Sequence, residues 1–333
     1  RHTRCLSDWS SDVCSSDLGN ANVKCYQYLA PVSTSNTNYN FGTDGGTTGW
    51  NMGAYTSRLA NENVKWETSE QYNVGLDARF LRQRLSLTFD AYIKNTKDWL
   101  VQAPVLATAG TGGPIINGGD VKNKGIELGL SWNDQIGKDL VYSVGANFAY
   151  NHNEVGAIPT KDGIIHGQEN QIYQNAEEFY RAENGHAIGY FWGYKTAGIF
   201  QNQQDINNWI AAGNGVMQSN VQPGDVKYID INHDGVINAN DKVDLGNGLP
   251  KYTFGFNFTL GYKGFDLSAN FTGAAGFQIA QSYRDPSSSQ ANYSRRILNR
   301  WTGEGTNNEI PRVTYGDVGN WLFSDLYLQD GDY

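Results

Sequence analysis

Six segments of the chain alternate between apolar and polar side chains with a period of two. They are residues 71–80, 84–94, 124–132, 140–151, 251–262 and 264–272. The clearest is 251–262, where small or polar residues separate Tyr252, Phe254, Phe256, Phe258 and Leu260. Because successive side chains of a β-strand point to opposite faces of a sheet, each segment is predicted to be a strand with one apolar and one polar face.

The connections between these segments alternate in length. Residues 81–83, 133–139 and 261–264 are short turns, whereas 95–123, 152–250 and the chain from 273 onward are long. In an up-and-down antiparallel sheet, alternate connections lie at the same end, so the short turns would gather at one end and the long loops at the other. The predicted fold class is therefore all-β: part of a transmembrane antiparallel β-barrel with short periplasmic turns and long extracellular loops. A soluble sandwich alternates equally well but has no reason to sort its loops by length.

Composition agrees with a membrane wall built from strands. The chain has no run of 18 apolar residues, so no transmembrane helix is predicted. Its net charge of −9 argues against a nucleic-acid surface. Tyrosines and tryptophans near strand ends fit interfacial belts, although any β-rich protein uses these residues; they are Tyr72, Tyr92, Trp99, Trp132, Tyr150, Tyr252 and Tyr262.

The two ends of the sequence differ from its middle. Residues 1–18, RHTRCLSDWSSDVCSSDL, lack the apolar core of a signal peptide and are interpreted as a non-native, adapter-derived segment. Cys5, Cys14 and Cys25 have neither a zinc spacing nor an even count for disulfides. Residues 19–333 are expected to be part of a barrel truncated at both ends, without plug and closing strands. Less regular segments near 188–200 and 312–328 would raise the count to eight strands, too few to close a barrel with such loops.

Six longer stretches, taken in order, carry a family resemblance. They are NVKWETSEQYNVGLDARFLRQRLSLTFDAYIKNTKDWLV (63–101), NGGDVKNKGIELGLSW (117–132), GHAIGYFWGYKTAGIFQNQQDINNW (185–209), PGDVKYIDINHDGVINANDK (223–242), LPKYTFGFNFTLGYKGFDLSANFTGAAG (249–276) and RRILNRWTGEGTNNEIPRVTY (295–315). This set resembles the TonB-linked outer-membrane proteins of the SusC/RagA family. Each stretch alone is moderately specific, whereas the ordered set is highly specific.

The resemblance implies a transporter component in the outer membrane of Bacteroidota-type bacteria. It implies a large barrel with an N-terminal plug, a SusD-like lipoprotein partner, and uptake of oligosaccharides or peptides energised by the TonB complex. The TonB complex would act through the N-terminal part of the protein, outside this chain. The alternative is a secreted or surface β-protein that binds glycans through calcium-stabilised loops.

The sequence contains no sign of an enzyme, and no catalytic residue is assigned. The five histidines lack metal-ligand spacing, and neither a Gly-x-Ser-x-Gly elbow nor a phosphate-binding loop occurs. The acidic pair Glu177 and Glu178 lies in a polar stretch and is interpreted as solvated surface rather than an acid–base pair.

An aromatic cluster in the longest loop suggests substrate binding. Tyr190, Trp192 and Tyr194 are assigned as substrate-binding residues because aromatic rings stack on sugars, and the loop is predicted to be extracellular. The alternative is that these rings, with Phe191, pack the loop against the barrel or a partner.

Residues 230–241 have the spacing of a calcium loop. Asp230, Asn232 and Asp234 hold positions 1, 3 and 5, Gly235 holds the sharp turn, and the Val236 carbonyl and Asp241 hold positions 7 and 12. A structural calcium ion is therefore a candidate cofactor, with metal ligands Asp230, Asn232, Asp234, Val236 and Asp241. Asp241 stands where such loops have glutamate, and no helix pair is predicted, so the alternative is a turn held by Asx side-chain hydrogen bonds.

Overall fold

The computed structural model describes most of the chain after residue 27. The described residues are 28–34, 38–40, 50–103, 105, 107–173, 176–281, 294–314 and 319–333. Segment 1–18 and the three cysteines lie outside them. The chain divides into two compact units: the first holds the described residues up to Gln71 with Lys94–Lys122 and Val155–Ile165, and the second holds Tyr72–Ile93, Asn123–Glu154 and the described residues from His166 onward.

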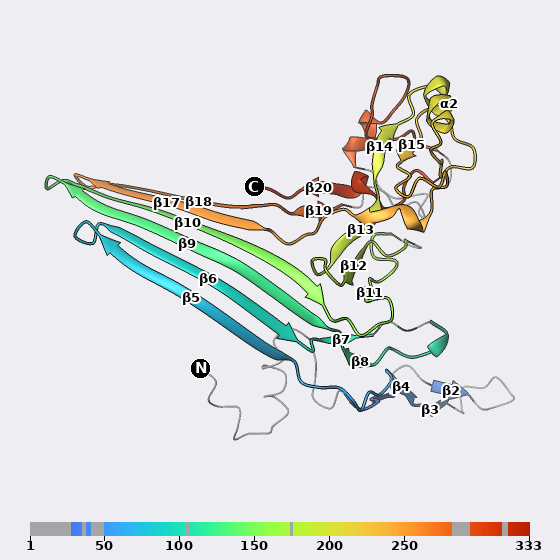
Figure 1. Ribbon diagram of the computed structural model, residues 1–333, viewed down its shortest axis with the longest axis horizontal. Coiled ribbons are helices and arrows are strands. Elements are labelled where there is room, and N and C mark those ends of the chain that lie inside the picture. The colour runs from blue at the N-terminus through green and yellow to red at the C-terminus, as the bar shows by residue number, and fades with distance from the viewer. Residues whose placement is uncertain are drawn as a thin grey trace. The chain divides into compact units, whose positions relative to one another are not determined.

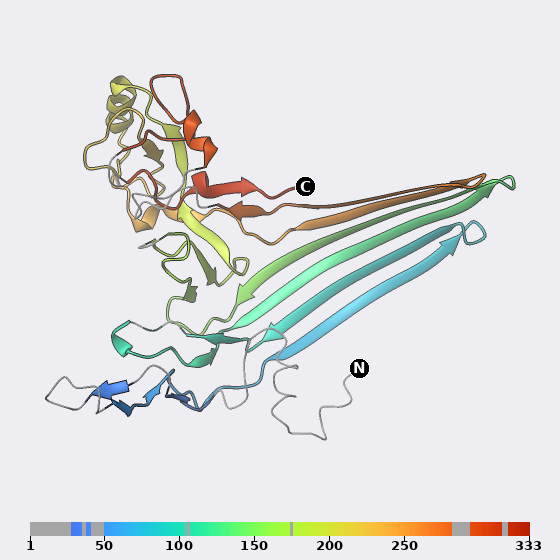
Figure 2. The same ribbon diagram turned by 180° about the vertical axis from the view of Figure 1, so that it is seen from behind.

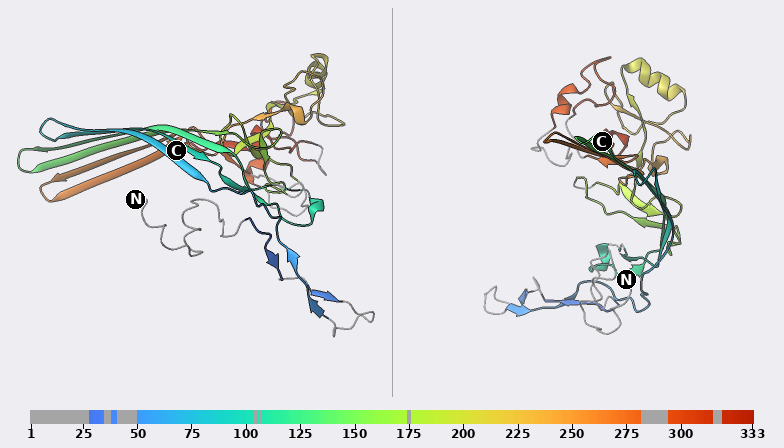
Figure 3. Two further views of the ribbon diagram at one scale, coloured as in Figure 1. Left: turned by 60° about the horizontal axis from the view of Figure 1, so that its bottom comes forward. Right: turned by 90° about the vertical axis from the view of Figure 1, so that its left-hand side faces the viewer.

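All six predicted strands are confirmed, and they form one sheet. They are β5 (Thr68–Phe80), β6 (Leu85–Lys97), β9 (Asp120–Ile136), β10 (Leu140–Gly156), β17 (Tyr252–Tyr262) and β18 (Phe265–Ala275). Their order in the sheet is β18-β17-β10-β9-β6-β5 (Figure 1). The three hairpin turns, residues 81–84, 137–139 and 263–264, gather at one end of the strands, and the reverse and tilted views agree (Figures 2 and 3).

The strand register brings the apolar positions of neighbouring strands onto one face. Phe256 lies opposite Ala146 of β10 and Phe271 of β18, and Leu260 lies opposite Tyr142 and Leu267. The intervening positions form a polar face, on which Asn257 pairs with Gly145 and Asn270. A Cβ atom at Gly145 would lie 2.5 Å from the Asn257 Oδ1 atom, so glycine leaves room for that amide. The alternation of apolar and polar residues along each strand thus gives the sheet one apolar and one polar face.

Backbone conformation explains why the hairpin turns are short. At the β17–β18 turn both central residues, Lys263 (φ 46°) and Gly264 (φ 86°), are left-handed, as two-residue hairpins of the mirror-image type require. The β5–β6 turn places Leu81, Arg82 and Gln83 in the left-handed region, which is unusual for residues with a Cβ atom.

Shorter strands outside the six-stranded sheet form small sheets of their own. Pairs are β1 (Val32–Ser33) with β4 (Tyr55–Thr56), β2 (Asn38–Asn40) with β3 (Trp50–Met52), β7 (Leu100–Gln102) with β8 (Ile115–Asn117), β14 (Thr196–Ile199) with β15 (Val226–Tyr228), and β19 (Gln278–Ala280) with β20 (Leu328–Asp330). A four-stranded sheet has the order β11 (Ile164–His166), β12 (Tyr180–Glu183), β13 (Tyr190–Tyr194), β16 (Lys242–Asp244). Helical segments are α2 (Gln203–Ala211), η2 (Ala107–Ala109), η3 (Ala239–Asp241), η4 (Arg295–Asn299) and η5 (Asp325–Tyr327).

The two less regular segments are not extra strands of the six-stranded sheet, and that prediction is wrong. Residues 188–200 contain β13 and β14, whereas the described part of 312–328 holds η5 and only the first residue of β20. Backbone groups of these segments bond to one another: the Tyr194 N–H donates to the Phe323 carbonyl at 3.0 Å. None of the described helices is long and apolar enough to cross a membrane.

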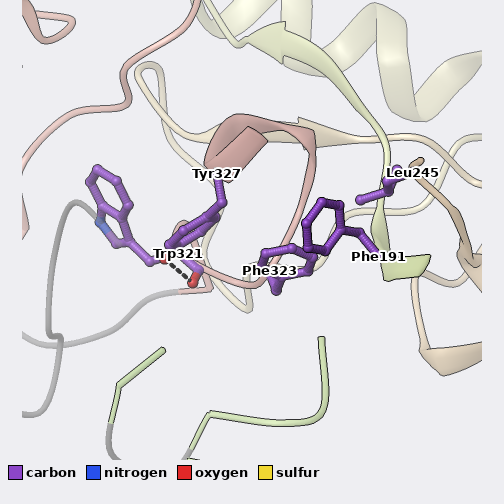
Figure 4. Packing of buried hydrophobic residues seen from close by; sticks show 5 residues of the cluster. All are labelled: Phe191, Leu245, Trp321, Phe323 and Tyr327. Atoms are coloured by element: carbon purple, nitrogen blue, oxygen red, sulfur yellow. Dashed lines mark hydrogen bonds between the residues drawn. The ribbon is translucent and has the colours of Figure 1, made fainter. Parts of the chain in front are cut away.

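Buried hydrophobic side chains of the second unit concentrate in its loops. One cluster contains Phe191, Leu245, Trp321, Phe323 and Tyr327, whose packing is drawn in Figure 4. There the Phe323 ring lies between those of Phe191 and Tyr327, with centroid distances of 6.4 and 5.6 Å. A second cluster contains Tyr194, Val226, Tyr228 and Ile237.

The apolar face of the six-stranded sheet remains exposed. Phe254 and Phe271 expose 47% and 61% of their surface. A sandwich would bury these side chains under a second sheet, whereas a barrel wall presents them to lipid. Their exposure favours the barrel prediction over the soluble alternative.

This difference between faces can be tested with one charge placed on either side of β17. Phe256→Lys puts an ammonium group on the apolar face near the middle of the strand, where a lysine in a bilayer costs about 2–4 kcal/mol. We expect Phe256→Lys to reduce membrane assembly strongly and the adjacent Asn257→Lys, on the polar face, to reduce it little. Heat-modifiable gel mobility of outer-membrane fractions measures assembly, and equal losses in the two variants would contradict the assignment of faces.

Candidate functional site in the long loops

The aromatic strand β13 is largely buried. Tyr190 and Tyr194 expose 0% and 5% of their surface, and Trp192 is half-buried. The Tyr190 hydroxyl donates to Glu183, and its ring stacks on His186 with a centroid distance of 4.6 Å. Burial, reinforced by the neighbouring Glu183 carboxylate, raises the pKa of Tyr190 well above its usual range. Tyr190 is therefore a neutral hydrogen-bond donor within the loop core.

Tyr194 and Trp192 also have intramolecular partners. Tyr194 packs edge-on against Tyr228 at 5.5 Å, and burial together with the nearby carboxylates of Glu177 and Asp241 raises its pKa to about 12. The Arg181 guanidinium lies 3.9 Å from the Trp192 ring centroid, a cation–π contact. The rings of Tyr190 and Tyr194 therefore pack within the loops, as the alternative interpretation of the sequence expected. Substrate binding by these three side chains stays a prediction, with Trp192 the most accessible.

Glu177 and Glu178 contact basic side chains of neighbouring strands. Glu177, with 71% of its side chain exposed, pairs with Lys242 of β16, in line with the surface interpretation. Glu178 is 15% exposed and contacts both Arg181 and His166, the latter at 2.9 Å. For Glu178 the expectation of a solvated side chain is wrong, because β12 brings Arg181 beside it.

Carboxylates of residues 230–241 accept hydrogen bonds from the loop's own backbone. Asp230 is buried and accepts from the Gly235 N–H at 2.7 Å. Asp241, also buried, accepts from the Ile231 N–H at 2.9 Å and, through its other oxygen, from the Asn238 N–H at 2.8 Å. Gly235 has a φ of 80°, the left-handed conformation that the motif predicts at this position.

The exposed half of the same loop is organised by side-chain turns. Asp234 accepts from the Val236 N–H at 2.8 Å, and Asn232 accepts from the Asp234 N–H at 3.0 Å. Such Asx turns are the alternative that the sequence left open. Oxygen atoms of the kind that calcium prefers are present, but the described part of the chain holds no group of three His, Cys, Asp or Glu side chains placed to share one metal ion. Calcium binding by Asp230, Asn232, Asp234, Val236 and Asp241 stays a prediction.

Sequence reasoning missed a buried ionic cluster around Asp225. This fully buried carboxylate accepts from the Arg312 Nε–H at 2.7 Å and from the Asn320 side-chain amide at 2.8 Å. The Oδ1 atom of Asn320 in turn accepts from the Gln218 side-chain amide at 3.0 Å. No local sequence signal marks these partners, because Asp225 and Arg312 are 87 positions apart. The cluster joins the loop before β17 to the chain after β18.

Comparisons with known proteins agree with the sheet and loop organisation. Residues 26–270 match the family model described as TonB dependent receptor-like, beta-barrel. The chain belongs to this family. The match confirms the predicted all-β barrel fold and the bacterial outer membrane as its location, and the family is one of receptors rather than enzymes.

Relatives and solved structures similar to this TonB-dependent receptor barrel include SusC and RagAB. TonB-dependent receptor P3 of Formosa agariphila is 30% identical over 283 residues, covering 84% of this chain and 27% of the relative. TonB-dependent receptor SusC of Bacteroides thetaiotaomicron is 28% identical over 277 residues, covering 82% and 25%. The structure of the RagAB peptide transporter matches 94% of this chain and 32% of its own, with a TM-score of 0.68 and 22% identity. The resemblance noted in the sequence is confirmed, and the chain spans about a quarter to a third of these proteins.

Helix α2 of this receptor barrel begins at a polar cap that reaches β15. Asn202 accepts from the Asp205 N–H at 2.9 Å, and Asp205 accepts from the Gln201 N–H at 3.0 Å and pairs with Lys227 at 2.7 Å. Burial disfavours the ionised carboxyl, but the hydrogen bonds from Lys227 and Gln201 and the Lys227 charge outweigh it and lower the pKa of Asp205.

The lowered pKa of Asp205 gives a pH prediction for the full-length protein. Ionised Asp205 stabilises the fold above the unfolded carboxyl pKa of about 4, and this contribution is lost as the pH falls through the lowered folded value. We expect Asp205→Asn to reduce the protease resistance of the α2 region at neutral pH. The difference in protease resistance between neutral pH and roughly pH 3 should therefore be smaller in this variant than in the wild type. The control Asp234→Asn should leave the acid dependence at α2 unchanged, and an Asp205→Asn profile parallel to wild type would contradict the pairing.

The 230–241 loop, whose buried carboxylates accept hydrogen bonds from its own backbone, gives a further prediction. Asp241→Asn replaces one acceptor oxygen of a buried carboxylate by an amide NH2 group, a donor that faces a backbone N–H, at a cost of about 1–3 kcal/mol. We expect faster proteolysis at this loop in Asp241→Asn than in Asp234→Asn, whose side chain is exposed, both in chelator and in millimolar calcium. Protection of the wild type that depends on calcium would instead establish the predicted metal site.

Proposed function

We propose that this chain forms barrel wall and extracellular loops of a TonB-dependent importer that takes up oligosaccharides or peptides. The observation that carries the proposal is the sorting of connections: three short turns lie at one end of the sheet, and the long connections fold into structured loops with a buried core. A passive wall segment has no need of such loops. Folded loops at the outer rim suit selection of a cargo before it enters the barrel.

A SusD-like lipoprotein is the partner we propose for these loops. Support comes from the family resemblance and from the likeness to SusC and to the RagAB peptide transporter. Coupling to the TonB complex would run through the N-terminal region of the complete protein. The exposed apolar wall weighs against the alternative of a secreted glycan-binding protein, since a soluble protein rarely leaves so large an apolar face uncovered.

Import is tested in the host by deleting the gene and restoring it in trans. We expect the deletion strain to lose uptake of one class of fluorescent cargo, oligosaccharide or peptide, and the complemented strain to regain it, with a lipoprotein co-purifying on the tagged barrel. Complementation with Trp192→Ala tests the aromatic prediction, and Trp66→Ala, at an exposed tryptophan outside the loop core, is the control. Uptake of both cargo classes unchanged by the deletion would contradict the proposed function, and wild-type uptake with Trp192→Ala would remove Trp192 from the site.

A further inference from the structure

A polar notch lies where β10 continues beyond the start of β17. Its cavity volume is about 210 Å³, and its walls come from the end of β10, the β12–β13 turn and the segment between β16 and β17. The side chains that matter for its chemistry are Asn151, His186, Asp244, Asn247 and Lys251. All of them belong to the second unit.

Hydrogen bonds inside the protein hold four of these side chains in fixed orientations. Asn151 accepts from the Tyr92 hydroxyl at 3.2 Å, and Asn247 accepts from the Leu249 N–H at 2.9 Å. Asp244 accepts from the Gly246 N–H at 2.7 Å and from His186 Nδ1 at 2.9 Å. Orientation before binding lowers the entropic cost of capturing a ligand.

The same bonds determine which atoms remain for a ligand. Since the Oδ1 atoms of Asn151 and Asn247 already accept, their Nδ2 amides are the free groups, and neither has a hydrogen-bond partner among the described residues. The Lys251 ammonium has no ion-pair partner in the described part of the chain either. His186 contacts the Asp244 carboxylate through Nδ1 at 2.9 Å, which leaves Nε2 for a ligand, as an acceptor in the tautomer that donates from Nδ1. The notch thus offers several donors and an acceptor.

The charge and the size of the notch restrict the class of ligand further. The lining holds one lysine and one aspartate, Lys251 and Asp244, whose charges are opposite, so the notch lacks the surplus positive charge of an anion site. Pockets that enclose a whole drug-sized ligand measure about 300–1,000 Å³, so this smaller notch accommodates one ring or end group. The larger cavity of about 340 Å³ differs, because its lining includes Ile297, Ile310 and Leu326.

We propose that this notch binds one neutral sugar residue of an oligosaccharide cargo. Hydroxyl groups both donate and accept hydrogen bonds, which matches the mixed set of free groups, and a pyranose ring is small and uncharged. The inference rests on the proposed import function and selects oligosaccharide from its two cargo classes. It also gives β13 a role that the sequence did not indicate: Tyr190 stacks on His186, and Trp192 pairs in register with Asp244, so the aromatic strand holds two of the notch residues.

The test exchanges a donor for an acceptor without removing the internal hydrogen bonds. Asn247→Asp and Asn151→Asp keep the Oδ1 acceptor that Leu249 or Tyr92 uses and replace the free amide by an oxygen. The matched control is Asn257→Asp, the same change on the polar face of β17. Full-length protein in detergent is applied to an array of defined neutral and uronic-acid oligosaccharides and to a tryptic peptide pool, and affinities for the bound members are measured by calorimetry.

We expect wild type and Asn257→Asp to bind a neutral oligosaccharide equally, and each notch variant to bind it at least about tenfold more weakly, the scale of one lost hydrogen bond. Unchanged affinity in both notch variants would overturn the inference, as would a wild type that binds only peptides or only acidic oligosaccharides. Those results leave the proposed import function intact. That function fails separately, if deleting the gene changes uptake of neither cargo class.

Discussion

The structure depends on the register between β10, β17 and β18. Because side chains alternate along a strand, a slip of one residue would move every phenylalanine of β17 from the apolar face to the polar one. The observed pairing places Phe256 beside Ala146 and Phe271, and Asn257 beside Gly145 and Asn270. In a bilayer this choice is strongly enforced, since lipid has no hydrogen-bond partner for a misplaced amide and the ladder must satisfy the backbone. The same register fixes the positions of the residues at the ends of these strands, including those that line the notch.

The loops follow a different rule. They fold as a water-soluble protein does, with aromatic side chains buried around Phe191, Phe323 and Tyr327 and a buried carboxylate matched by Arg312 and Asn320. A buried ion pair of this kind adds little net stability by itself, but removing one partner leaves an uncompensated charge. The Asp225 cluster is therefore better understood as specifying which loop segments meet. The proposed import function requires such defined loops, because selective binding at a rim needs fixed donors and acceptors.

The candidate sites differ in how much of each could be predicted from the sequence. Gly235 and the acidic residues around it are recognisable from spacing, and the structure gives Gly235 the left-handed backbone that the spacing predicts. The aromatic run 190–194 was noticed for its composition, yet composition cannot say which rings are covered, and the fold buries Tyr190 and Tyr194. The notch has no sequence signature, because almost the whole long connection 152–250 separates Asn151 from Asn247. The two residues line one cavity only because β10 and β17 pair.

The sequence by itself determined the wall: six amphipathic strands, their order of short and long connections, and the family to which the chain belongs. These follow from a local period of two and from nearby turn residues, which need no knowledge of distant contacts. Only the tertiary structure decided that segment 188–200 and the described part of 312–328 pair outside the main sheet, that Glu178 has Arg181 and His166 as partners, and that Asp225 meets Arg312. Such contacts join residues far apart in the chain, and their partners are selected by burial and hydrogen-bond satisfaction in three dimensions rather than by any repeating local pattern.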